Sequence, residues 1–529
     1  MYQALAYDDL AAFDAFVVYN LCQKELSDEF VTDLEGHGLD YAPWPPRVND
    51  TLDIKYVRQL KIEALDVLIS CLAQLGATRD AKVMLAELRR EQELLNLPDM
   101  SSTSHEILTT CRDSFFGYSR REFFPWSTYE PDRNSDQSTK EINQYLSGIS
   151  SAVEAKVTAL PAFDATGAAN GQVSYQLGLF AKAELQPGSE IFAEKSLLTA
   201  IRPLEDAICD ACGQELEDIP FEEIRQCGGD NCDISFCSDD CKTRAASEYH
   251  HQLIEQEENE EDDDDPTYST DGSADSQADG AEFSAATATQ EKAKRAPFCG
   301  NEDLNTIGRL TTTDTPEWDL YFLLLTRTIA MSVTQKVHPL QLIETRYLWG
   351  DFNAFQSPFL HTPVKRTLPF SFVHNLQYVL DYFSTLSLSD PSSAPYSAHW
   401  LQNFDFWILQ TLFAKFRGVA NATQSTFDGK PEIASVHPGW SLANHSCAPN
   451  VRWTPKGVRR FVVRTKEERT WEEDREQRTE WKGIEAGGEI FSHYTDIRLP
   501  VRERRDRLRG VLGGDCHCKR CIREATAGS

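Results

Sequence analysis

The spacing of the cysteines constrains this chain of 529 residues more than any other sequence feature. Of its fourteen cysteines, Cys22, Cys71 and Cys111 lie outside any grouping that suits a metal, and we expect them to be small buried side chains. Most of the others recur two to five residues apart on polar stretches. In a reducing compartment such spacing is typical of metal ligands rather than of disulfides. The sequence therefore predicts loops organised by a soft cation, usually Zn²⁺ with tetrahedral sulfur and nitrogen ligands.

A dense central group of cysteines predicts more than one metal ion. Its members are Cys209, Cys212, Cys227, Cys232, Cys237 and Cys241. Two tetrahedral zinc sites need about eight ligands, so two more must come from elsewhere in the chain. His250 follows the group, and Cys299 lies beyond residues 255–296, which hold 14 acidic and 3 basic side chains. We expect residues 255–296 to be a disordered insert, because the entropy of loop closure rises only slowly with loop length.

Three further motifs stand toward the C-terminus. Residues 441–450 read Ser-Leu-Ala-Asn-His-Ser-Cys-Ala-Pro-Asn, and residues 489–494 read Glu-Ile-Phe-Ser-His-Tyr. They are followed by Cys516, Cys518 and Cys521, which offer three thiols to a site that needs a fourth ligand. The order and the separations of these motifs resemble those of SET-domain protein lysine methyltransferases, and the central cysteine group resembles a MYND zinc finger.

The chain is therefore similar to the SET and MYND domain (SMYD-like) protein lysine methyltransferases over residues from about 155 to 523, and its N-terminal third lies outside this resemblance. The resemblance implies an α+β fold in which a MYND zinc finger and a helical insert split a β-rich SET domain. We expect these parts in order: a helical N-terminal region at 1–150, the first part of the SET domain at 151–204, the finger at 205–300, the helical insert at 301–420, the SET catalytic core at 421–498 and a cysteine-rich post-SET zinc tail at 499–529.

Local patterns agree with this division. Apolar residues recur every three or four positions from Tyr56 to Leu75, and Gly76 and Thr78 are suited to end one helix and begin the next. We expect a helical hairpin here, either as a helical domain packed on the enzyme core or as a single tetratricopeptide-type unit. Alternating residues from Val153, and a short run at 188–194, predict strands.

By resemblance, five residues form the methyl-transfer site. Asn444 and His445 hold S-adenosylmethionine through the amide side chain and backbone contacts, and Tyr494 is the catalytic residue that orients the amine. Gly178 lies in a glycine turn against the cofactor. Asn421 matches an upstream asparagine that contacts the cofactor, with a plain turn or cap role as the alternative.

The resemblance also implies about three zinc ions. His250 and Cys299 complete the finger, with His251 as the alternative to His250 and a solvent-exposed histidine pair as the plainer interpretation. Cys447 supplies the fourth ligand beside the tail cysteines, unless it is merely buried. A zinc ion held in this way joins the tail to the active site.

Charge restricts the partners. A net charge of −31 disfavours nucleic acid, which is bound by clustered Lys and Arg, and favours a basic protein substrate, either a histone or another. The finger suggests a proline-rich partner. No long apolar run and no signal peptide are present, so we expect no membrane and a location in the nucleus, the cytoplasm or both.

One alternative function accompanies this interpretation, and one stretch outside the motifs carries a prediction of its own. Gln176 and Leu177 depart from the family pattern before Gly178, which leaves open a catalytically inactive SET/MYND zinc-finger adaptor or transcriptional regulator that binds protein partners. The charge-rich stretch at 465–478 is predicted to be a solvated hairpin extension.

Overall fold

Our description of the fold comes from a computed structural model. It covers residues 8–26, 54–75, 78–98, 124, 126–163, 168–201, 208–228, 234–250, 316–348, 380, 402–419, 421–424, 431–454, 457–471, 480–512 and 514–527. The predictions for Gly76, Cys111, Cys232, His251, the acidic insert at 255–296 and Cys299 fall outside these described residues.

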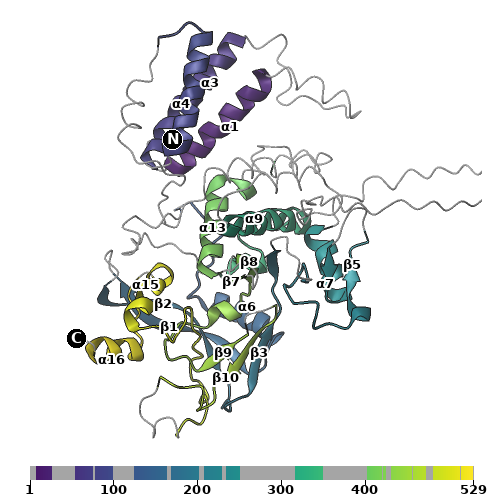
Figure 1. Ribbon diagram of the computed structural model, residues 1–529, viewed down its shortest axis with the longest axis vertical. Coiled ribbons are helices and arrows are strands. Elements are labelled where there is room, and N and C mark those ends of the chain that lie inside the picture. The colour runs from purple at the N-terminus through teal and green to yellow at the C-terminus, as the bar shows by residue number, and fades with distance from the viewer. Residues whose placement is uncertain are drawn as a thin grey trace, which may run out of the picture.

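Three helices form the N-terminal unit at one end of the molecule (Figure 1): α1 (Asp8–Leu26), α3 (Ile54–Gln74) and α4 (Thr78–Leu94). The predicted helical hairpin is confirmed as α3 and α4, and α1 packs along α3. Cys22 and Cys71 are buried, as expected. Phe13 of α1 stacks on Phe406 with ring centroids 4.6 Å apart, which joins the unit to the rest of the chain.

A buried cation holds the three helices together. Lys61 of α3 is fully buried, and its Nζ donates hydrogen bonds of 2.7 Å each to Gln23, Glu87 and Glu91. Glu91 also accepts a 2.6 Å bond from Arg58. Because every donor of the ammonium group has an acceptor, the charge can remain in a helical core.

The β-rich part is assembled from two distant segments of the chain. The hairpin β1 (Val153–Phe163) and β2 (Ala169–Ala181) precedes two three-stranded sheets, whose orders are β3-β10-β9 and β4-β8-β7. In each sheet one strand from before residue 202 pairs with strands from after residue 420, so everything between is an insertion. The bounds are β3 (Glu190–Glu194), β4 (Leu198–Ile201), β7 (Asn421–Gln424), β8 (Pro431–Val436), β9 (Val451–Trp453) and β10 (Arg459–Val463).

The inserted segment contains the cysteine-rich loops and two long helices. Its elements are η2 (Phe221–Glu223), β5 (Arg225–Gln226), β6 (Ser235–Phe236), α7 (Asp239–Ala245), the π-helical turn η3 (Ala246–His250), α9 (Pro316–Gln335), α10 (Ile343–Arg346) and α13 (Phe406–Val419). Arg327 of α9 makes two 2.8 Å bonds to the carboxylate of Asp210, which stands between Cys209 and Cys212. Its guanidinium also lies 4.6 Å from the ring centre of Tyr249. This buried pair fixes the cysteine-rich loops on α9.

The remaining elements frame the C-terminal motifs. Helix α6 (Asp136–Ser147) packs on β1, the 3₁₀ turn η5 (Trp440–Leu442) leads into the Asn444 motif, and α15 (Val501–Leu512) and α16 (Lys519–Ala527) carry the tail. In Figure 1 this tail lies beside β1 and β2, on the side of the sheets away from α7. No helix among the described residues has both the length and the apolarity needed to cross a membrane.

The prediction of a solvated extension at 465–478 holds for Lys466, Glu467 and Thr470, which are exposed, and is wrong for Arg469 and Trp471. Arg469 and Trp471 are 9% and 8% exposed. The guanidinium of Arg469 stacks 3.9 Å from the ring centre of Trp481, and Trp481 donates a 2.7 Å bond to the carbonyl of Arg464. Cation–π stacking allows the charged side chain of Arg469 to be buried here. The prediction of a solvated stretch, which rested on the number of charges, did not take this into account.

We predict that Lys61→Ala opens the N-terminal unit. Removing the ammonium group leaves Glu87 and Glu91 facing each other, which costs about 3–5 kcal/mol for a buried pair. Hydrogen exchange of the α3 amides, measured by mass spectrometry, should show a fall of that size in the local opening free energy.

The matched control is Arg90→Ala on α4. Arg90 pairs with Glu87 at 3.0 Å, but its side chain is 61% exposed. Its loss should cost less than about 1 kcal/mol. Equal effects of the two substitutions would show that the buried position of Lys61 is not what matters.

Candidate functional site

The two C-terminal motifs lie against each other. The main chain of Ser492 donates to the carbonyl of Asn444 at 2.9 Å, and Ser446 donates back to Ser492 at 2.8 Å. Asn450 completes the join, since its side chain donates to the carbonyl of Glu489 at 2.8 Å and accepts from the amide of Phe491 at 2.7 Å. Residues 444–450 are thus fixed beside residues 489–494.

Gly178 does not lie in a turn, as the sequence had suggested. It is an interior residue of β2, paired with Lys156 of β1. A Cβ at this position would lie 2.8 Å from Oε1 of Glu489 and 3.0 Å from Nδ2 of Asn444. The glycine is therefore needed because two polar side chains, one from each C-terminal motif, pack against its backbone.

Glu489 is the centre of this small polar cluster. It accepts hydrogen bonds from Asn444 at 2.8 Å and from the hydroxyl of Thr158 at 3.3 Å. Desolvation raises the pKa of its carboxyl group, although both hydrogen bonds oppose the shift. The cluster is a half-buried acidic group held by an amide and a hydroxyl.

Tyr494 stands at the end of the second motif with its phenol directed back toward the first. Its hydroxyl donates to the carbonyl of Ala443 at 2.9 Å. Desolvation, followed by the nearby charge of Glu489, raises the pKa of the phenol, so it stays protonated at neutral pH. The phenol oxygen keeps lone pairs that can accept a hydrogen bond from another group.

His445 links Tyr494 to Cys447. Its Nδ1 lies 3.1 Å from the amide nitrogen of Tyr494, and its Nε2 lies 3.3 Å from Sγ of Cys447. Because an amide N–H can only donate, Nδ1 is the acceptor, and we assign the imidazole proton to Nε2, which faces the sulfur. Desolvation lowers the pKa of His445 to about 4, so the ring is neutral.

Asn421 is the first residue of β7, where its backbone pairs with Ser435 of β8. Its side chain is not among those that the structure describes. A contact between Asn421 and a cofactor therefore stays a prediction.

The tail cysteines and Cys447 form one cluster. The sulfur atoms of Cys447, Cys516, Cys518 and Cys521 all lie within 4.8 Å of one another. Zn–S bonds of about 2.3 Å in a tetrahedron place the sulfurs about 3.8 Å apart, and Cys447 lies 4.0 Å from Cys516 and 3.4 Å from Cys521. The hydrogen bond between Cys521 and Cys447 lowers the pKa of the Cys521 thiol to about 7, and Arg504 lies 3.6 Å from that sulfur. The four thiols could hold a zinc ion.

A second cluster lies in the inserted loops. It contains Cys209, Cys212, Cys237 and Cys241, also with all sulfurs within 4.8 Å. Cys227, which lies between these two pairs in sequence, is left out, and its sulfur instead lies 3.3 Å from Nε2 of the buried His250. The two groups are thus interleaved along the chain.

Some residues of the site were missed by sequence reasoning. Glu489 could have been found, because it opens the motif that ends in Tyr494. Thr158 and Glu194 carried no sequence signal. Glu194 of β3 is buried and accepts the main-chain N–H groups of Gly439 and Trp440 at 2.9 and 2.7 Å, which fixes the entry to the Asn444 motif.

Comparison with known proteins gives a short match. The chain is 35% identical over 88 residues to N-lysine methyltransferase SMYD2 of Gallus gallus, 34% over 88 residues to SMYD2-B of Xenopus laevis and 33% over 88 residues to SMYD2 of Homo sapiens. This stretch relates the chain to N-lysine methyltransferases. It covers 17% of the chain and 16–17% of each relative, so the chain spans about a sixth of their length. No family model matches the chain.

We predict that Gly178→Ala destabilises the β1–β2 hairpin, because the added methyl group would displace Glu489 and Asn444. Overpacking of this kind typically costs about 1–3 kcal/mol. Hydrogen exchange of the β2 amides measures it. The control is Gly148→Ala, at a position with φ −75° and a nearest neighbour 3.4 Å from the new Cβ. If the two variants were equally stable, the close packing around Gly178 would be refuted.

We also predict that the two cysteine clusters each hold one zinc ion. Cys521→Ser and Cys241→Ser should each lower the zinc content of the purified full chain by about one ion, because three thiols bind a structural zinc ion poorly. Cys71→Ser, which changes a buried cysteine outside both clusters, should leave the content unchanged. Mass spectrometry of bound metals gives the answer, and an unchanged zinc content in either cluster variant would exclude that site.

Proposed function

We propose that this chain is an S-adenosylmethionine-dependent protein-lysine N-methyltransferase of the SET type, which acts on a histone or another basic protein. The observation that carries the proposal is the meeting of the two C-terminal motifs, which brings Asn444 and Glu489 together beside Gly178 and holds the hydroxyl of Tyr494 on the carbonyl of Ala443. The short match to N-lysine methyltransferases supports the same reaction class.

The polar cluster is chemically suited to this cofactor. S-adenosylmethionine carries a sulfonium cation and an amino-acid end, and it supplies the methyl group of the reaction. The carboxylate of Glu489 favours a nearby positive charge, and the amide of Asn444 can bond both a carboxylate and an ammonium group. We assign cofactor binding to Asn444, to the main chain of His445, to the strand at Gly178 and to Asn421.

The residues around Tyr494 prepare the lysine. A free lysine has a pKa of ~10.4, so its amine must shed a proton and its water before it can act as a nucleophile. The hydroxyl of Tyr494 is held by Ala443, and its free lone pairs accept an N–H of the amine and aim the nitrogen lone pair. Alignment of this kind can lower a barrier by about 7–11 kcal/mol.

His445 has a positioning role in this proposal. Its two ring nitrogens connect the backbone of Tyr494 to Cys447. A zinc ion bound by Cys447 would therefore help to fix the position of Tyr494. Loss of that metal reduces turnover as well as stability. A third zinc ion, bound by Cys227 and His250 with Cys232 and Cys299, completes the finger.

The alternative function, a catalytically inactive adaptor, rested in part on the unusual residue Leu177. Leu177 departs from the family pattern, but it is buried at 7% exposure in the core that also contains Val153 and Leu179. Packing thus accounts for the residue.

We also propose a proline-rich partner at the finger and a location in the nucleus or the cytoplasm. Neither proposal depends on methyl transfer.

The test is transfer of labelled methyl groups from S-adenosylmethionine to proteins of a cell extract and to purified histones. Tyr494→Phe removes one oriented hydrogen bond of about 1.5 kcal/mol or more, so we expect at least about a tenfold lower rate. The control is Tyr56→Phe, an exposed tyrosine of α3 that should leave the rate unchanged. A folded and zinc-loaded chain could bind the cofactor in calorimetry and yet transfer no methyl group to any protein. That result would refute the proposed enzyme activity and favour the adaptor.

A further inference from the structure

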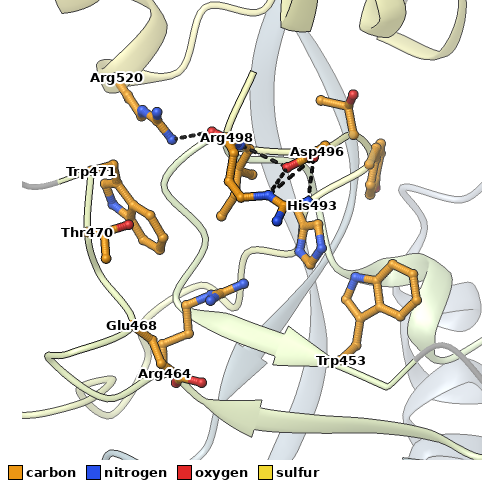
Figure 2. A pocket seen from close by; sticks show the side chains of 12 residues that line it. Trp453, Arg464, Glu468, Thr470, Trp471, His493, Asp496, Arg498 and Arg520 are labelled. Atoms are coloured by element: carbon orange, nitrogen blue, oxygen red, sulfur yellow. Dashed lines mark hydrogen bonds and ion pairs between the residues drawn. The ribbon is translucent and has the colours of Figure 1, made fainter. Parts of the chain in front are cut away.

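A cavity of about 790 Å³ opens next to Tyr494 (Figure 2). It is lined by Trp453, Arg464, Glu468, Thr470, Trp471, His493, Tyr494, Thr495, Asp496, Ile497, Arg498 and Arg520. Neither Gly178 nor Asn444 is among these residues, so the cavity does not include the proposed cofactor cluster. Its size suits several side chains of a bound peptide.

One wall of the cavity is built by the charge-rich stretch that follows β10. Glu468, Thr470 and Trp471 come from this stretch, and Trp471 is packed against the tail. Its carbonyl accepts a 3.1 Å bond from Arg523 of α16, and Arg520 lies 5.9 Å from its ring centre. Trp453, stacked on His493 at 5.3 Å, forms the opposite side. In Figure 2 the two tryptophans face the space from either side.

Most charges in the cavity are already paired. Arg520 donates to the carbonyls of Cys447 and Ile497 at 2.8 and 2.9 Å, and Arg498 makes a two-point contact with Asp496. Glu468 pairs with Arg452, outside the cavity, at 2.9 Å. These groups hold the walls in place and leave little charge for a ligand.

Arg464 is different. Its Nε donates to the carbonyl of Val451 at 3.1 Å, and its guanidinium lies 5.3 Å from the ring centre of Trp471. Among the described residues no carboxylate forms an ion pair with it. Burial lowers its pKa, and the charge of Glu468, whose carboxylate pairs with Arg452, opposes that shift. Figure 2 shows the side chain extending from the edge of β10 into the space between Trp471 and Trp453.

We propose that this cavity binds the residues that flank the substrate lysine, and that Arg464 selects an acidic side chain among them. The inference rests on the proposed function. A guanidinium group presents parallel N–H donors that match a carboxylate, and the flanking indole rings can cover the apolar stem of a Glu or Asp. The substrate is then a basic protein, as the net charge favours, whose target lysine has an acidic neighbour.

The experiment uses the full chain and a set of peptides with one lysine each. At every position from three before to three after the lysine, Glu is compared with Gln and with Lys. We expect Glu at one position to raise kcat/KM and peptide affinity about tenfold over Lys. In Arg464→Glu the preference at that position should reverse, and in Arg464→Lys it should survive in weaker form.

The matched control is Arg460→Gln. Arg460 lies on β10, four residues before Arg464, and is exposed in an ion pair with Glu190. It should leave the preference unchanged. Equal methylation of all peptides by the natural chain, or the same preference in Arg464→Glu, would overturn the inference.

Binding, followed by fluorescence anisotropy of labelled peptides, separates this inference from the proposed function. A preference for Glu in binding without any methyl transfer would support the cavity and refute the enzyme. Methyl transfer without any dependence on the flanking charge would do the reverse. A variant Arg464→Glu that binds every peptide equally poorly would show that Arg464 only supports the fold.

Discussion

The side chain of Asn450 holds the candidate site together. By bonding the carbonyl of Glu489 and the amide of Phe491, it replaces the hydrogen bonds that a regular strand partner would provide. Tyr494, His445 and the polar cluster around Glu489 all take their positions from this junction. An amide side chain is suited to the task, because it donates and accepts at once and satisfies two main-chain groups that would otherwise be buried unpaired.

The parts of the structure that sequence predicted well are those set by local pattern. The apolar repeat from Tyr56 to Leu75 gave a helix, and the alternation from Val153 gave a strand, because both depend only on neighbours in the chain. The cysteine spacing anticipated the clusters for a similar reason. The spacing did not predict which sulfurs lie together. Cys227 lies outside the cluster of four central cysteines and contacts His250 instead.

What sequence did not predict depends on contacts between distant segments. Gly178 was expected in a turn, but it is a strand residue whose need for glycine comes from Asn444 and Glu489, far along the chain. Trp471 was expected on a solvated extension, but Arg469, Arg520 and Arg523 surround it. Charged residues in a sequence signal solvent only when no aromatic face or carbonyl is available to receive them.

The division of the sheets between two segments also affects how the chain is made. Strand β4 ends at Ile201 and its partner β8 begins at Pro431, about 230 residues later. At a synthesis rate of about 5–20 residues per second, β3 and β4 wait on the order of 10–50 s before their partners leave the ribosome. During that time their edges and apolar faces are without their native partners, which leaves them open to wrong pairing. Closure of the site is therefore a late event in biogenesis, after the cysteine-rich loops and long helices have already emerged.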